Sequence, residues 1–304
     1  MPAHVPVLLD EVVNHMISNL SGTYVDATFG RGGHARALLA RLAPDARLSV
    51  VDRDPDAIRC AHELAALDGR VTVVHGAFSG LGEYFATSSG RVDGVLLDIG
   101  VSSPQLDEAT RGFSFRAEGP LDMRMDPTRG QTAAEWLATA REEDIADVLW
   151  RYGEERRSRQ IARRIVTTRA NAPLSTTGDL ARLVRECVYH RGGRIDPATR
   201  TFQAVRMQVN DELGELDAAL DAALTLLAVG GRLLVIAFHS LEDRMVKQRF
   251  RALDDARRAA ERENGTDAPR FRLVARKAIM AGPEESATNP RARSARLRVL
   301  ERVQ

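Results

Sequence analysis

The segment from Tyr24 to His34, which reads Tyr-Val-Asp-Ala-Thr-Phe-Gly-Arg-Gly-Gly-His, constrains the fold more than any other part of this chain. A short apolar run ends in Asp26, a glycine-dense turn follows, and a helix-like stretch continues to Leu42. Glycine has no Cβ and adopts positive φ at little cost, so this strand, turn and helix start would let a ligand approach the backbone. The segment therefore predicts a binding site for a nucleoside-containing cofactor.

The turn alone does not identify that cofactor. Gly30-Arg-Gly-Gly-His-Ala35 also fits the G-x-G-x-x-A pattern of dinucleotide-binding turns, which occurs often by chance. A nicotinamide dinucleotide, S-adenosylmethionine and a purely structural turn are all open at this point.

Composition bounds the class of protein. The chain has 304 residues and 44% hydrophobic content, enough to bury one large or two smaller domains. Its net charge of +1 gives no global basic field, so a nucleic-acid surface would need local segregation of charge. Cys60 and Cys187 have no His or Cys at metal-ligand spacing, and no apolar stretch is long enough to span a bilayer. We expect a cytoplasmic protein with no metal and no membrane partner.

Short β-branched or leucine-rich runs alternate with helix-like segments in the first third, which is typical of a parallel sheet with right-handed crossovers. The expected strands are residues 24–27, 47–51, 71–75, 92–99, 232–238, 271–274 and 296–300. The predicted class is α/β, with an open sheet.

Between Gln105 and Val209 the pattern changes to helical stretches without a convincing strand. The expected helices are residues 132–140, 142–152, 154–170 and 178–189. A further helix from Asp211 to Ala228 is predicted to end at Gly230-Gly231. We therefore predict a discontinuous domain of residues 1–106 and 210–304, with residues 107–209 as a helical insertion.

Four residues stand at the carboxyl ends of the expected strands, where ligands bind in open α/β sheets. Asp26 precedes the glycine turn, Asp52 ends the second strand, Phe78 follows the third and Asp98 ends the fourth. Asp52 could accept both ribose hydroxyls, and Phe78 could lie against an adenine. The alternative is that such acids only cap the next helices, as Asp54 is expected to do.

The fourth strand favours one cofactor over the other. It continues as Asp98-Ile-Gly-Val-Ser-Ser-Pro-Gln105. Hydride transfer would require a proton donor, usually His, Tyr or Lys, beside the hydride-accepting pocket, and none is evident here. An acid followed by a Ser-Pro turn resembles the motif with which amino-group methyltransferases hold an exocyclic nitrogen. Methyl transfer is therefore the leading hypothesis.

Longer motifs extend this resemblance over nearly the whole chain. They include Asp98–Leu106, Arg111–Phe115, Pro120–Met125, Phe238–Arg244 and Asn289–Ser294. In these motifs the chain resembles the MraW family, whose members methylate the N4 atom of a cytidine in the decoding centre of bacterial 16S rRNA. The resemblance implies a class I S-adenosylmethionine-dependent methyltransferase fold, Rossmann-like with a mostly parallel seven-stranded sheet, and an inserted helical domain for substrate recognition.

The resemblance also implies site residues and a partner. Cofactor contacts carry over to Gly32, Gly33, His34, Asp52, Phe78, Asp98 and Gln105. The implied partner is 16S rRNA in the small ribosomal subunit, and a homodimer is one alternative for the oligomeric state.

Catalysis is expected at Asp98, Ser103 and Pro104. The cytosine N4 lone pair is delocalised, so the main task is to hold N4 in line with the methyl donor beside a hydrogen-bond acceptor. That acceptor could be a backbone carbonyl or a hydroxyl of the Ser-Pro turn. Asp98 could accept a hydrogen bond from the amino end of the cofactor or from N4, and both remain open. Stacking on the base would fall to Phe113, Phe115 or Phe238, unless these are core aromatics.

Contact with RNA is expected to be local. Residues 141–206 contain fourteen Arg against nine acids, so part of this surface could bind phosphate.

Three alternatives to methylation of 16S rRNA stay open. They are an amino-methyltransferase acting on DNA or another RNA, a dinucleotide-dependent oxidoreductase, and a non-catalytic rRNA-binding assembly factor.

Overall fold

The structure is a computed structural model that describes residues 6–88, 91–188, 196–262 and 270–304. The chain divides into two compact units. The first combines Met1–Gly100 with Gly214–Gln304, and the second is Val101–Leu213. Each unit has its own hydrophobic core.

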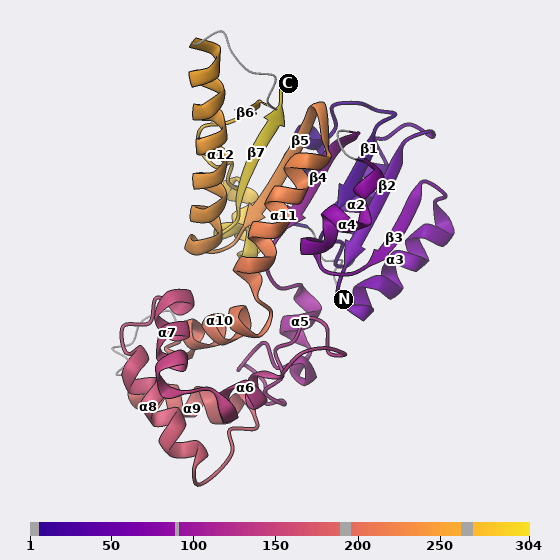
Figure 1. Ribbon diagram of the computed structural model, residues 1–304. Coiled ribbons are helices and arrows are strands. Elements are labelled where there is room, and N and C mark those ends of the chain that lie inside the picture. The colour runs from indigo at the N-terminus through magenta and orange to yellow at the C-terminus, as the bar shows by residue number, and fades with distance from the viewer. Residues whose placement is uncertain (1–5, 89–90, 189–195, 263–269) are drawn as a thin grey trace. The chain divides into compact units, whose positions relative to one another are not determined.

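The first unit is built on a seven-stranded sheet in the order β3-β2-β1-β4-β5-β7-β6. Strands β1 to β5 pair in parallel, and β7 runs antiparallel to both of its neighbours (Figure 1). The strands are β1 (Thr23–Asp26), β2 (Arg47–Asp52), β3 (Val71–His75), β4 (Val92–Asp98), β5 (Leu227–Ala237), β6 (Phe271–Leu273) and β7 (Arg296–Arg302). The predicted α/β class and the mostly parallel seven-stranded sheet are confirmed.

Helices cover both faces of this sheet, because side chains that alternate along each strand point to opposite faces. Leu96 of β4 joins the core on one face, and Leu97 joins the core on the other. The first face is covered by α1 (Leu9–Met16), α2 (Gly33–Leu39) and α3 (Pro55–Leu67). The second face is covered by α4 (Leu81–Tyr84), α11 (Glu212–Leu226) and α12 (Ser240–Arg262). The short helices η1 (Phe78–Gly80), η2 (Ala86–Ser88), α13 (Pro283–Thr288) and η4 (Pro290–Arg293) lie in the connections.

The start of β5 differs from the prediction. Helix α11 ends at Leu226 and the strand begins at once with Leu227, which pairs with Val92. The register then shifts, and Gly230 takes a positive φ of 84° inside the strand. The two glycines therefore do not end the helix. They accommodate an irregularity within the strand, a role that glycine often plays in sheets.

The second unit is helical within its described residues, apart from one isolated bridge between Pro120 and Thr176. Its helices are α5 (Ser103–Asp107), η3 (Ala109–Arg111), α6 (Ala133–Thr139), α7 (Glu142–Gly153), α8 (Ser158–Arg169), α9 (Thr177–Cys187) and α10 (Ala198–Val209). Apolar residues from α6 to α10 form one core. The assignment of this unit to substrate recognition stays a prediction.

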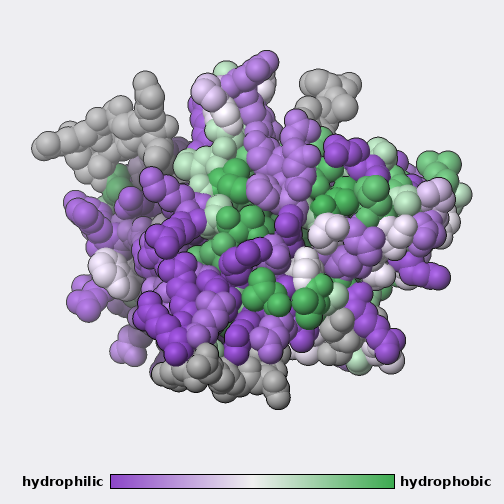
Figure 2. Space-filling view, turned by 90° about the horizontal axis from the view of Figure 1, so that it is seen from above, coloured by the Kyte–Doolittle hydropathy of each residue, from purple (hydrophilic) through white to green (hydrophobic). Residues whose placement is uncertain are grey.

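One face of the surface is mostly hydrophilic (Figure 2). On the face seen in Figure 2, hydrophilic residues surround smaller groups of apolar ones. Among the helices of the described residues, none combines the length and the apolar character needed to cross a lipid bilayer.

Candidate cofactor and active site

The glycine turn between β1 and α2 has the backbone that the sequence predicts. Gly30 and Gly32 have φ values of 56° and 76°, which favour glycine. A Cβ on Gly32 would come within 2.5 Å of the Phe29 ring, and one on Gly33 within 2.1 Å of the Pro6 ring. The turn is therefore closely packed from inside the protein and leaves no room for side chains at these two positions.

Asp52 fixes the same turn from the neighbouring strand. Its Oδ2 accepts a hydrogen bond from the backbone N–H of Gly30 at 2.8 Å, and its Oδ1 accepts one from Asp54 at 2.9 Å. Burial raises the pKa of the Asp52 carboxyl, and these two hydrogen bonds oppose the shift. The next acid has a different task, because Asp54 accepts from the N–H of Asp56 and caps α3. The capping alternative therefore describes Asp54, and Asp52 faces the turn.

Thr28 connects the ends of β1 and β4. Its N–H donates to Asp26 Oδ1 at 3.2 Å, and its hydroxyl oxygen accepts from the N–H of Asp98 at 2.7 Å. Burial raises the pKa of the Asp26 carboxyl to about 6. The nearby charge of His34 opposes this shift, whereas those of Asp98 and Asp52 add to it. The three strand-end acids therefore lie close enough to influence one another.

Asp98 carries the least satisfied polar atom of this group. Its Oδ1 is buried and has no hydrogen-bond partner among the described residues, and its Oδ2 lies 3.6 Å from His34 Nδ1. Burial raises the pKa of the Asp98 carboxyl to about 7, with Arg291 opposing the shift and Glu242 adding to it. A buried oxygen without a donor is costly, so this atom marks a place where a ligand can donate a hydrogen bond.

His34 is buried on the first turn of α2. Its Nε2 lies 3.0 Å from the carbonyl oxygen of Val7, and burial lowers the pKa of the imidazole. Phe78 begins η1 shortly after β3 and is half-buried against the core of the second face. The structure thus gathers Asp26, Asp52, Asp98 and His34 around the glycine turn. Phe78 follows the next strand along the same edge of the sheet.

The Ser-Ser-Pro turn belongs to the second unit and begins α5. Ser102 caps this helix in a capping box with Gln105: the Ser102 N–H donates to Gln105 Oε1 at 2.9 Å, and the Gln105 N–H donates to Ser102 Oγ at 3.5 Å. Ser103 and Pro104 form the first turn of α5. Gln105 is buried and has a structural task here, so its role in cofactor binding stays a prediction.

The aromatic residues proposed for base stacking have packing roles. Phe113 is buried, and Phe115 packs edge-to-face on Phe202 with ring centroids 4.8 Å apart. Phe238 is half-buried against the core of the first face.

Sequence reasoning missed Thr28, although this residue lies inside the segment from Tyr24 to His34. It interpreted Glu242 only as a helix-opening acid, and that carboxylate does accept from the N–H of Phe238 at 3.1 Å.

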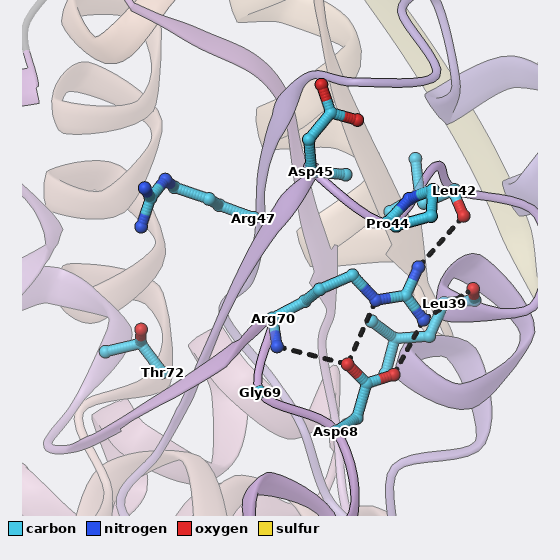
Figure 3. A pocket seen from close by; sticks show the side chains of 10 residues that line it. Leu39, Leu42, Pro44, Asp45, Arg47, Asp68, Gly69, Arg70 and Thr72 are labelled. Atoms are coloured by element: carbon cyan, nitrogen blue, oxygen red, sulfur yellow. Dashed lines mark hydrogen bonds and ion pairs between the residues drawn. The ribbon is translucent and has the colours of Figure 1, made fainter.

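A surface pocket of about 730 Å³ lies at the opposite edge of the sheet, where β2 and β3 begin (Figure 3). Its central side chain is Arg70, which donates to the Asp68 carboxylate and to the carbonyls of Leu39 and Leu42. These bonds hold the end of α2 against the turn before β3. We assign the pocket no ligand, because its arginine has a structural role and ligands of such sheets bind at the carboxyl ends.

The order of the strands, the antiparallel β7 and the acid-lined glycine turn define a class I S-adenosylmethionine-dependent methyltransferase. The chain belongs to the MraW methylase family, whose model matches residues 1–303. The sequence-based predictions of family, fold class and cofactor are thereby confirmed.

Curated relatives agree over almost the full length. A protein of Xanthomonas euvesicatoria is 53% identical over 305 residues, which cover 99% of this chain and 89% of the relative. A protein of Cupriavidus pinatubonensis is 54% identical over 312 residues, which cover 99% and 92%. One of Burkholderia vietnamiensis is 51% identical and covered to 97% of its length. Each is named ribosomal RNA small subunit methyltransferase H.

Proposed function

We propose that this protein transfers a methyl group from S-adenosylmethionine to the N4 atom of a cytidine in the decoding centre of 16S rRNA, within the small ribosomal subunit. The names of the relatives support an rRNA substrate. The observation that carries the choice of an amino group is the Ser103 hydroxyl in the first turn of α5, which has no partner within the described part of the chain and can accept a hydrogen bond from N4. A ribosomal substrate would place the activity in the cytoplasm. The oligomeric state stays open, with a homodimer as one alternative.

The residues at the carboxyl edge of the sheet fit this cofactor. S-adenosylmethionine carries a positively charged sulfonium and an amino group, and three acids surround the glycine turn. Asp98 Oδ1 can accept a hydrogen bond from an amino group, and Asp52 retains acceptor capacity for ribose hydroxyls. In this proposal Gly32, Gly33 and His34 form the wall of the site, and Phe78 lies toward the adenine.

The protein's contribution to catalysis is mainly positioning. The bound cofactor supplies an electrophilic methyl group, and alignment of the amine with it can supply roughly 7–11 kcal/mol. An acceptor aimed at the N4 hydrogens would also stabilise the positive charge that develops on nitrogen. Pro104 helps by fixing φ in the first turn of α5 and so the direction of that turn.

The acceptor proposed here is a hydroxyl of the turn. The carbonyls of Ser102 and Pro104 already accept hydrogen bonds from the N–H groups of Leu106 and Glu108, at 3.3 and 2.8 Å. The Ser103 hydroxyl has no partner within the described part of the chain. We therefore expect Ser103→Ala to lower kcat by roughly fivefold at saturating cofactor, since one hydrogen bond is worth about 1 kcal/mol. An unchanged kcat would indicate that a backbone carbonyl, and not the Ser103 hydroxyl, accepts the hydrogen bond from N4.

Contact with rRNA phosphates is proposed for the exposed side of α8. This helix contains four arginines and no acid. Arg164 pairs with Glu186 at 3.1 Å, and Arg169 donates to carbonyls at the end of α6. Arg159 and Arg163 are exposed, one turn apart, and have no acidic partner among the described residues. Arginines that are not neutralised by the protein are the ones free to bind phosphate.

Parallel methylation assays test the proposal. Purified small ribosomal subunits, protein-free rRNA and duplex DNA are each incubated with this protein and labelled S-adenosylmethionine. We expect label in the rRNA of the subunits and none in the DNA. Label in DNA would favour the alternative amino-methyltransferase, and no label on any substrate would favour a non-catalytic assembly factor.

A further inference from the structure

The tautomer of His34 follows from its surroundings. Its Nε2 lies 3.0 Å from the carbonyl oxygen of Val7, and a carbonyl can only accept, so Nε2 carries the hydrogen. Burial lowers the pKa of His34, while the charge of Asp26 opposes the shift. The ring is therefore neutral near pH 7, with its lone pair on Nδ1.

That lone pair faces the carboxyl group of Asp98. The Nδ1 atom of His34 lies 3.6 Å from Asp98 Oδ2, slightly beyond hydrogen-bond distance. With its pKa near 7, Asp98 is about half protonated at neutral pH and could donate to Nδ1 after a small movement. If the O–H bond of Asp98 breaks as an N–H bond forms on His34, a carboxylate and an imidazolium result. The net charge of the pair does not change.

The groups around the pair determine where the proton resides. Charged groups reach it from β1, α12, α13 and η4, and they are Asp26, Glu242, Glu285 and Arg291. Asp26 and Glu285 stabilise an imidazolium at His34. Arg291 favours a carboxylate at Asp98, and Glu242 opposes it. A hydrogen-bond donor or positive charge at the unpartnered Oδ1 would further favour the ionised pair.

We propose that His34 is a positioning residue that takes the proton of Asp98 when the cofactor binds, so that the site ionises without releasing a proton to solvent. The inference rests on the proposed binding of the cofactor at this edge, and not on the identity of the RNA target. Proton acceptance from Asp98 would be a second role for His34, separate from its hydrogen bond to the Val7 carbonyl.

Two variants separate these tasks. In His34→Gln, the amide nitrogen can reach the position of Nε2 and keep the bond to Val7, but no base faces Asp98. In His34→Asn, an amide can take the position of Nδ1, but the bond to Val7 is lost. A purely structural role for His34 predicts that Asn does more damage than Gln. A proton-accepting role predicts that both variants change the proton balance of cofactor binding.

The test is calorimetric titration with S-adenosylmethionine between pH 6 and 7.5, in buffers of different ionisation enthalpy. The variant Asp98→Asn gives the proton count of the cofactor's own amino group, which is subtracted. We expect the wild type to release almost no proton and to take up part of one toward pH 7.5, where free Asp98 is already mostly ionised, so that its Kd rises by no more than about fourfold. We expect His34→Gln to release more than half a proton on cofactor binding at pH 6.5. Its Kd should therefore fall as pH rises, by up to about tenfold per pH unit.

Release of most of one proton by the wild type would overturn the inference, even if neither His34 variant folds. Equal proton counts for His34→Gln and the wild type would also overturn it. A wild-type protein that does not bind S-adenosylmethionine would instead refute the proposed cofactor site, and the inference with it.

Discussion

Asp52 Oδ2 accepts a 2.8 Å hydrogen bond from the backbone N–H of Gly30, which joins the end of β2 to the turn that follows β1. The two residues are 22 positions apart in the chain. This bond holds the acid proposed to bind ribose against the glycines proposed to contact the rest of the cofactor. The geometry of the site thus depends on contacts within the sheet edge itself.

Removal of the Asp52 carboxylate is expected to weaken cofactor binding more than folding. Asp52→Ala should cost roughly 1.5–3 kcal/mol of binding free energy, because a charged acceptor is lost. Asp52→Asn keeps one acceptor oxygen and should recover part of that loss. Calorimetric titration with S-adenosylmethionine measures the effect, with thermal unfolding as a check on the fold. An affinity equal to wild type in both variants would exclude Asp52 from the site.

Gly32 is expected to tolerate no side chain. In Gly32→Ala, the Cβ would combine a φ of 76° with a 2.5 Å approach to the Phe29 ring. The variant should lose roughly 1–3 kcal/mol of unfolding free energy and most of its cofactor affinity. Gly69→Ala is the matched control, because a Cβ there meets nothing within 4 Å. Denaturant unfolding of both variants measures the difference, and equal stability would contradict the packing described for the turn.

The contribution of Asp98 and Asp26 to the stability of the cofactor-free protein is expected to fall as pH rises from 5 to 8. The pKa of Asp98 is raised to about 7 and that of Asp26 to about 6, so the folded state holds protons that the unfolded state has already lost. The unfolding free energy decreases wherever the folded state binds more protons. Asp98→Asn removes the contribution of Asp98 to this pH dependence. The unfolding free energy of the variant should therefore exceed that of the wild type by an amount that grows with pH, to roughly 2–4 kcal/mol at pH 8.

Denaturant unfolding at several pH values measures this trend. Asp255→Asn, which removes an exposed acid on α12, controls for the loss of one negative charge. If the difference between Asp98→Asn and wild type does not change with pH, Asp98 is ionised throughout. Asp98 would then carry no proton that His34 could accept when the cofactor binds.

The arginines of α8 give a prediction for salt dependence. Arg159→Gln with Arg163→Gln should weaken binding to small subunits and reduce the slope of log affinity against log salt by about 1.4, if each binds one phosphate. The matched control is Arg141→Gln with Arg151→Gln, because these exposed arginines pair with Asp144 and Asp147 on α7. Filter binding at several salt concentrations distinguishes the two. Equal slopes for the two double variants would place the RNA elsewhere.

Much of the first unit could be predicted from sequence, because its strands are short apolar runs between turn signals. Strand β4, Val92–Asp98, lies almost where the pattern placed it. Helix α10 was not predicted. It contains Phe202, Val205 and other residues of low helix propensity, and it forms because these side chains are buried in the core of the second unit. Its buried residues Ala198, Thr201, Phe202 and Val205 nevertheless recur at helical spacing, so the sequence did carry a local signal for this helix.

The sequence was enough to predict which residues form the candidate site, but not the hydrogen bonds between them. Asp26, Asp52 and Asp98 could be found because parallel strands end at one edge. The pattern separated Asp52 from Asp54, which was expected to cap α3 and does, but it could not show that Asp52 holds the glycine turn through the N–H of Gly30. The bond between His34 and Val7 joins residues 27 positions apart, and no motif records it.

The activity that we propose for this protein is methylation of N4 of one cytidine in 16S rRNA. Mass mapping of modified nucleosides in 16S rRNA, from cells with and without this protein, tests it most directly. We expect one N4-methylated cytidine in the decoding centre that disappears when the protein is absent and returns with the wild type but not with Asp98→Ala. An unchanged set of methylated cytidines would contradict it.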